Sequence, residues 1–165
     1  MLLPLKILLI LVLLFICYQD YKDRLVYWLL YPIVGVLGFG IQIAYLDYKI
    51  IILNSLINLI FITILLFITY IYTTFILKKQ WLNQSIGSGD ILLFIFLSFT
   101  FSFISFIILL TFSLVFSLLL HTLSPILRSY NKACITVPLA GYIALFFSVV
   151  YMASLFFNSN YLFAY

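Results

Sequence analysis

The segment from Ile91 to Leu127 constrains the fold most, because it contains no aspartate, glutamate, lysine or arginine. It directly follows Gly87-Ser-Gly-Asp90, so a carboxylate stands at its start. As one helix, Ile91–Ile126 would be about 54 Å long, which exceeds the roughly 30 Å hydrocarbon core of a bilayer. As two helices joined by a tight turn near residues 101–105, it gives two short spans of about 17 residues each.

The composition indicates that the rest of the chain also belongs in a membrane. Of its 165 residues, 67% are hydrophobic and 7% are charged, and the mean hydropathy is +1.34. Soluble domains are about half apolar and about one quarter charged. The alternating strands of an outer-membrane barrel are absent from the sequence. We therefore predict one all-α integral membrane domain over residues 1–165, with lipid as its surroundings. The basic residues are too few and scattered to indicate a nucleic-acid partner.

Four further segments are apolar and long enough to cross a bilayer. They are Leu2–Tyr18, Leu25–Leu46, Ile50–Leu77 and Pro138–Phe157. The first has no small-x-small cleavage site before Tyr18, so we interpret it as a membrane helix of the mature protein. Pro32 lies inside the second segment and is expected to bend it. Together with two helices from the uncharged segment, these give six predicted spans.

The distribution of cations favours six spans over five. With six, one side of the membrane receives six cations and the other receives two, whereas a single long helix would divide them four and four. Cytoplasmic loops are enriched in lysine and arginine, so the richer side is predicted to be cytoplasmic and both termini lie outside. Asp20, Asp23 and Asp90 then share the cytoplasmic face. The richer side contains Lys22, Arg24, Lys78, Lys79, Arg128 and Lys132, and the other contains Lys6 and Lys49.

Each of these acids has a simple structural interpretation when it is taken alone. Asp90 is expected to be the first residue of a helix, where the helix dipole favours a carboxylate. Gly87 and Gly89 add the capacity for positive φ angles and close backbone approach, which a cap does not need. Asp20 and Asp23 alternate with Lys22 and Arg24, as in a salt-bridged loop.

Two aspartates from separate helices at the same depth have a chemical interpretation as well. Like charges a few ångströms apart cannot both ionise, so the two carboxyl groups would share a proton. One could activate a water molecule while the other protonates the departing group. The sequence suggests no competing apparatus, since His121 is the only histidine and reads as an interfacial residue. Cys17 and Cys134 have no metal-ligand spacing and are interpreted as small apolar residues, so no metal or cofactor is predicted.

Three features resemble the type IV prepilin leader peptidases, which are membrane aspartyl proteases with a GxGD motif. Gly87-Ser-Gly-Asp90 is similar to the second aspartate motif, and Asp20-Tyr-Lys-Asp-Arg-Leu-Val26 is similar to the first. Val137-Pro-Leu-Ala-Gly-Tyr-Ile-Ala144 is similar to the start of the family's last helix. The resemblance implies that Asp20 and Asp90 are the catalytic pair, with Gly87 and Gly89 supporting the motif. It also implies a bacterial inner-membrane enzyme that removes the basic leader of a prepilin-like protein without a cofactor.

Several alternatives stay open from the sequence. Asp23 could replace Asp20, because residues three apart share a helix face. Tyr27 stands where the family usually has proline, and Leu92 stands where it usually has lysine. The cysteine-rich insertion of the bifunctional family members is absent, so cleavage without methylation is expected. A non-enzymatic scaffold or assembly subunit of a pilus or secretion system is the main alternative. A transporter is less favoured, since no acid is predicted near the bilayer midplane.

Overall fold

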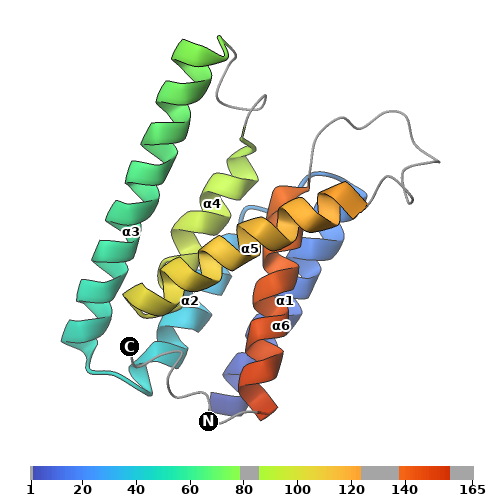
Figure 1. Cartoon of the computed structure of the whole chain (residues 1–165). Helices are drawn as coiled ribbons and strands as arrows, with labels where there is room; N and C mark the ends of the chain where they lie inside the picture. The colour runs from blue at the N-terminus through green and yellow to red at the C-terminus, as the bar shows by residue number, and fades with distance from the viewer. Residues whose placement is uncertain (1, 79–85, 124–137, 157–165) are drawn as a thin grey trace.

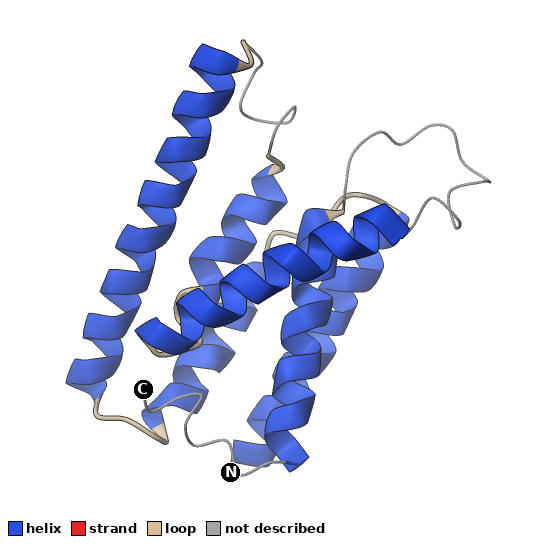
Figure 2. Ribbon diagram, in the orientation of Figure 1, coloured by secondary structure: helices blue, strands red, loops and turns tan. Residues whose placement is uncertain are grey.

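Every regular element in the computed structural model, which describes residues 2–78, 86–123 and 138–156, is a helix (Figures 1 and 2). The all-α prediction is therefore confirmed. Several residues used in the sequence argument lie outside the described ranges, namely Lys79, Arg128, Lys132, Cys134 and Val137. The helices are α1 (Leu2–Lys22), α2 (Leu30–Ile43), α3 (Tyr48–Ile71) with its π-helical continuation η1 (Tyr72–Ile76), α4 (Ser88–Leu97), α5 (Phe103–Leu123) and α6 (Leu139–Phe156).

The helices alternate in direction, so that their ends gather at two ends of the bundle (Figure 1). At one end α1, α3 with η1, and α5 finish, and α2, α4 and α6 begin. We call this the aspartate end; it is defined by Lys22, Leu30, Ile76, Ser88, Leu123 and Leu139. Helices α1 and α6 lie antiparallel and form the most extensive contact, while α2 packs on α1 and α4. Helix α5 crosses the bundle diagonally and packs on α6 (Figure 1).

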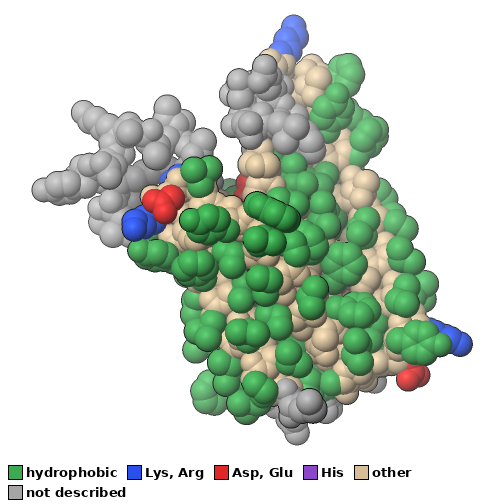
Figure 3. All heavy atoms as spheres, turned by 180° about the vertical axis from the view of Figure 1, so that it is seen from behind, with side chains coloured by type: hydrophobic (Ala, Val, Ile, Leu, Met, Phe, Trp, Pro, Cys, Tyr) green, Lys and Arg blue, Asp and Glu red, His purple; other side chains and the backbone are tan. Residues whose placement is uncertain are grey.

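In the part of the chain that the structure describes, four helices are long and apolar enough to cross a membrane: Leu2–Lys22, Tyr48–Ile76, Phe103–Leu123 and Leu139–Phe156. Large apolar side chains cover much of the surface, with charged side chains toward the edges of the face seen in Figure 3. Such an extensive apolar surface is not tolerated in water. The chain is thus a multi-pass membrane protein. The described residues form six α-helices, but α2 and α4 have only 14 and 10 residues and are shorter than a full span.

The predicted boundaries of the second span were wrong at both ends, since α2 covers Leu30–Ile43 rather than Leu25–Leu46. Pro32 explains why α2 begins at Leu30. It lies in the first turn of α2, where a missing N–H group needs no partner, instead of bending a helix interior. The segment before Leu30 forms a connection in which the Tyr27 N–H donates to Gln19 Oε1 at 3.2 Å.

The uncharged segment does divide into two helices, but the division is unequal. Its turn covers residues 98–102, so α4 has 10 residues and α5 has 21, instead of about 17 each. Asn58 of α3 holds this turn, because its Nδ2 donates to the carbonyl oxygens of Ser98 and Phe101, both at 3.0 Å. Backbone groups that leave a helix at membrane depth need such partners, since lipid offers none.

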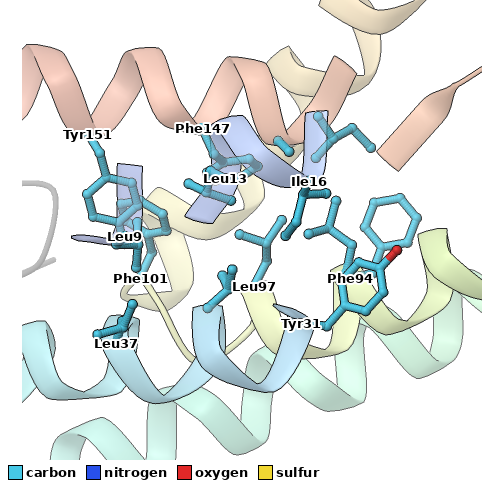
Figure 4. Close-up of a cluster of buried hydrophobic side chains, with 14 of the residues drawn as sticks. Leu9, Leu13, Ile16, Tyr31, Leu37, Phe94, Leu97, Phe101, Phe147 and Tyr151 are labelled. Atoms are coloured by element: carbon cyan, nitrogen blue, oxygen red, sulfur yellow. The ribbon is translucent and has the colours of Figure 1, made fainter. Parts of the chain in front are cut away.

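A buried core joins α1, α2, α4 and α6 and fixes the positions of their ends (Figure 4). Small residues let α2 approach α4 and the following turn closely. A Cβ atom at Gly35 would lie 2.8 Å from Phe96, and one at Gly38 would collide with Thr100. Small residues at helix contacts are the usual means of close packing in membranes. The labelled core residues are Leu9, Leu13, Ile16, Tyr31, Leu37, Phe94, Leu97, Phe101, Phe147 and Tyr151.

Candidate functional site

Asp20 lies in the last turn of α1 and is half-buried against the start of α6. Its Oδ2 accepts a 2.6 Å hydrogen bond from the Gly141 N–H. The first N–H groups of a helix have no partner within the helix, and the positive end of its dipole favours an anion. Gly141 also leaves the space that the carboxylate needs, because a Cβ atom there would lie 3.0 Å from Oδ2.

Asp90 is the third residue of α4 rather than the first, so the predicted position was two residues out. Its Oδ2 accepts the Gly87 N–H at 3.1 Å, which is the returning half of a capping box. Gly87 has an extended backbone, with φ −72° and ψ 146°, and no described glycine has a positive φ. The glycines of the motif therefore do not use their capacity for positive φ angles.

The two aspartates converge on neighbouring backbone groups of α6. Asp20 accepts from Gly141, and the Ala140 N–H is directed to the Asp90 carboxylate. Ala140 and Gly141 are consecutive residues in the first turn of α6, so both carboxylates face the same helix start, and the charge of Asp20 acts on Asp90. The structure thus brings together the two acids that the sequence paired, at one end of the bundle.

Asp90 is outside the four membrane-spanning helices, and its surroundings favour the protonated form. Burial, and to a smaller extent the negative charge of Asp20, raise the pKa of the Asp90 carboxyl to about 6. The N–H groups of Gly87 and Ala140 act in the opposite direction, since they stabilise the carboxylate. A carboxyl with such a pKa can hold or release a proton near neutral pH, which general acid catalysis requires.

Tyr31 is a member of this site that sequence reasoning missed. The side chain is only 1% exposed and reaches from α2 to α4, where it lies near Phe94 (Figure 4). A Cβ atom at Gly89 would lie 2.5 Å from the Tyr31 hydroxyl oxygen, so the second glycine of the motif accommodates this side chain. The charges of both Asp20 and Asp90 act on the hydroxyl. Tyr31 is one of thirteen tyrosines, and no local pattern distinguishes it from the others.

The remaining acids lie elsewhere. Asp23 is exposed just beyond α1, and Asp47 directly precedes α3 at the opposite end of the bundle, where its side chain makes no capping hydrogen bond. The structure therefore places Asp20, and not Asp23, against α6. Arg24, which has a φ of 55°, lies near enough for its charge to act on Asp20. No group of three histidine, cysteine, aspartate or glutamate residues suited to a metal occurs among the described residues.

The two positions that depart from the prepilin peptidase pattern have definite surroundings. Tyr27 is exposed, but its backbone N–H binds Gln19, a hydrogen bond that proline could not donate. Leu92 is partly buried and packs against the core, where a lysine would need a partner. Both residues therefore have a structural role in this chain.

The comparisons with known proteins identify no relative, since no family model, curated protein or solved structure matches the chain. The fold and site themselves define a class: a multi-pass, all-helical membrane protein in which two aspartates meet at the start of a helix. Its resemblance to the prepilin leader peptidases stays a prediction from the sequence.

Proposed function

We propose that the protein is an aspartyl endopeptidase of the bacterial cytoplasmic membrane. Its substrate would be a prepilin-like protein, cut between a short basic leader and a hydrophobic helix. The observation that carries this proposal is the convergence of Asp20 and Asp90 on the neighbouring Gly141 and Ala140 N–H groups. Two carboxyl groups in such proximity are the whole chemical apparatus of a metal-independent aspartyl protease.

The surroundings of the two acids suggest different roles for them. Asp90, whose pKa is raised, would enter the reaction protonated. Asp20, whose Oδ2 accepts the short hydrogen bond from the Gly141 N–H, would enter as the carboxylate. Asp20 would take a proton from water as the oxygen attacks the peptide carbonyl carbon. Asp90 would supply the proton that the amine needs when the C–N bond breaks, and the proton on Asp20 then restores the pair.

An apolar groove of about 400 Å³ between α3 and α4 supports the proposal that the substrate contains a hydrophobic segment. Ile95 lies five residues after Asp90 on the same helix, which corresponds to about 7.5 Å along its axis. A hydrophobic helix in this groove would therefore approach the aspartates at the aspartate end. The lining includes Leu59, Ile62, Leu66, Phe67 and Ile95.

The proposal is tested by co-expression with a protein that has a basic leader followed by a hydrophobic helix, with intact mass as the readout. Asp20→Asn and Asp90→Asn should each lower processing at least about 100-fold, because each removes a group that acts in the transition state. Asp23→Asn and Asp47→Asn are matched controls and should process normally. If a folded Asp20→Asn or Asp90→Asn variant processes as the wild type does, that residue is not catalytic.

A scaffold or assembly subunit is the second candidate, and one observation favours it. The carboxylates accept N–H groups at the starts of α4 and α6, which is also what purely structural helix caps do. In that case Asp20→Asn would lower thermal stability, because it weakens the bond to the Gly141 N–H, and the wild type would leave the co-expressed substrate uncut. Proteolysis and stability measured on one set of variants therefore separate the two candidates.

A further inference from the structure

Tyr31 is the one buried tyrosine that adjoins both aspartates, among the residues that the structure describes. Its hydroxyl oxygen lies over the backbone of Gly89, one residue before Asp90. The charged and titratable groups at this site come from two helices. Helix α1 and its end contribute Asp20, Arg24 and Cys17, and α4 contributes Asp90. Helix α6 contributes backbone N–H groups.

The hydroxyl of Tyr31 has the chemistry of a neutral donor. Loss of its proton would put a third negative charge beside two carboxylates, so the phenol keeps that proton. A Cβ atom built at Gly89 would lie 2.5 Å from this hydroxyl oxygen, and the charges of Asp20 and Asp90 both act on it. A buried hydroxyl normally has a partner, and the adjoining carboxylates are the strongest acceptors at hand.

We propose that Tyr31 is the positioning residue of the aspartate pair: its hydroxyl donates a hydrogen bond to the ionised carboxylate, and Gly89 is glycine because this hydroxyl occupies the space of a Cβ atom. The catalytic consequence rests on the proposed protease function, whereas the donor role and the contact with Gly89 do not. The proposal gives the second glycine of the Gly87-Ser-Gly-Asp90 motif a specific partner within this chain.

The first test is a double-mutant cycle of Gly89→Ala and Tyr31→Phe, with the unfolding temperature in detergent as the readout. In the presence of Tyr31, the new Cβ atom would meet the hydroxyl oxygen at 2.5 Å. After Tyr31→Phe, the ring atom nearest to the new Cβ atom would be Cζ, at 3.6 Å, which is an ordinary van der Waals contact. Gly89→Ala should therefore lower the unfolding temperature by about 5 °C alone and much less in combination with Tyr31→Phe.

The control for this cycle is Gly40→Ala in both backgrounds, because a Cβ atom at Gly40 would meet nothing within 4 Å. Its effect should be the same with and without Tyr31→Phe. Equal effects of Gly89→Ala in both backgrounds would overturn the inferred contact.

The second test measures protonation of the aspartates, and it needs no substrate. Infrared titration of the carboxyl band, assigned with Asp20→Asn and Asp90→Asn, should show that Tyr31→Phe raises an aspartate midpoint by about one pH unit, because the ionised form loses a donor. Tyr151→Phe is the control, since Tyr151 is also buried but packs against Phe101. Unchanged midpoints in Tyr31→Phe would overturn the donor role.

Cleavage by the same variants separates this proposal from the protease proposal. If the wild type cuts a prepilin-like peptide, Tyr31→Phe should lower kcat about 10–100-fold with KM nearly unchanged, and should move the acidic limb of the pH profile upward. If the kcat of Tyr31→Phe equals that of the wild type, Tyr31 does not support catalysis. A wild type that cuts nothing refutes the protease proposal, and the cycle and titration then decide the role of Tyr31.

Discussion

The Gly141 N–H donates a 2.6 Å hydrogen bond to Asp20 Oδ2 and so joins the end of α1 to the beginning of α6. These two helices also form the most extensive contact in the bundle. The carboxylate therefore occupies a position that the packing of two long helices determines, and its orientation does not depend on a loop. An acid held in this way suits both catalysis and helix capping, which is why the predictions below measure activity and stability separately.

Gly141→Ala should disrupt this bond. The added Cβ atom would lie 3.0 Å from Asp20 Oδ2 and 3.2 Å from Asp20 Cβ. The Cβ of Asp20 is fixed to α1, so relief requires α1 and α6 to separate slightly. We expect a loss of about 1–3 kcal/mol in the free energy of unfolding, measured by thermal or denaturant unfolding in detergent.

Gly40→Ala again provides the matched control. It lies in a helix with open space at the Cβ position, and should be neutral or stabilising by up to about 1 kcal/mol. A Gly141→Ala protein as stable as the Gly40→Ala protein would show that the close approach of Asp20 is not required for packing.

The protonation of Asp90 should appear in the pH dependence of cleavage. If Asp90 acts as the general acid, kcat falls as the pH rises through about 6, because the carboxyl then loses its proton. The measurement is kcat against pH on a soluble reporter peptide in detergent. A kcat that rises through this range would exclude Asp90 as the acid.

The raised pKa of Asp90 also predicts how the stability of the folded protein depends on pH. The folded-state pKa of Asp90 lies above its ordinary value of 3.8, so the native protein retains a proton that the unfolded chain releases. The stabilisation of the folded state by this proton is complete below pH 3.8 and is lost as the pH rises through about 6. Asp90→Asn, which stays neutral, should remove this dependence and be at least as stable as the wild type at pH 7.5.

The sequence predicted those features that depend on length, hydrophobicity and charge. The number of helices follows from the apolar segments, and the count of cations put Asp20 and Asp90 at the same end. The segment from Ile91 to Leu127 had to divide, because no bilayer accommodates a helix of its length. These arguments need no knowledge of which side chains touch.

The features that the sequence did not predict depend on contacts between distant segments. Asn58 sets the position of the turn after α4 from another helix. The partners of Asp20 and Gly89 are Gly141 and Tyr31, and no local pattern connects either pair. Pro32 lies in the first turn of α2 because the connection before this helix ends at Leu29. Gln19 helps to fix that connection through its hydrogen bond with the Tyr27 N–H.

Asn58→Leu tests whether this side chain holds the α4–α5 turn. The substitution removes two 3.0 Å hydrogen bonds and leaves the carbonyl groups of Ser98 and Phe101 without this donor in an apolar environment. We expect a loss of about 2–4 kcal/mol in the free energy of unfolding, since each lost bond also leaves a desolvated acceptor. Asn54→Leu, on the same helix and only half-buried, is the control and should have little effect. Equal stability of the two variants would show that the turn does not depend on Asn58.

The predicted orientation in the membrane is tested with two matched cysteine variants. Tyr21 lies at the aspartate end and is 66% exposed, whereas Tyr48 lies at the opposite end and is 65% exposed. In a background with Cys17→Ser and Cys134→Ser, a membrane-impermeant maleimide should label Tyr48→Cys in spheroplasts and label Tyr21→Cys only after lysis. The physical reason is that Lys22, Arg24 and Lys78 stand at the aspartate end, and such cations are retained on the cytoplasmic side. The opposite labelling pattern would put the aspartates outside the cell, where a leader on the cytoplasmic side of the membrane could not reach them.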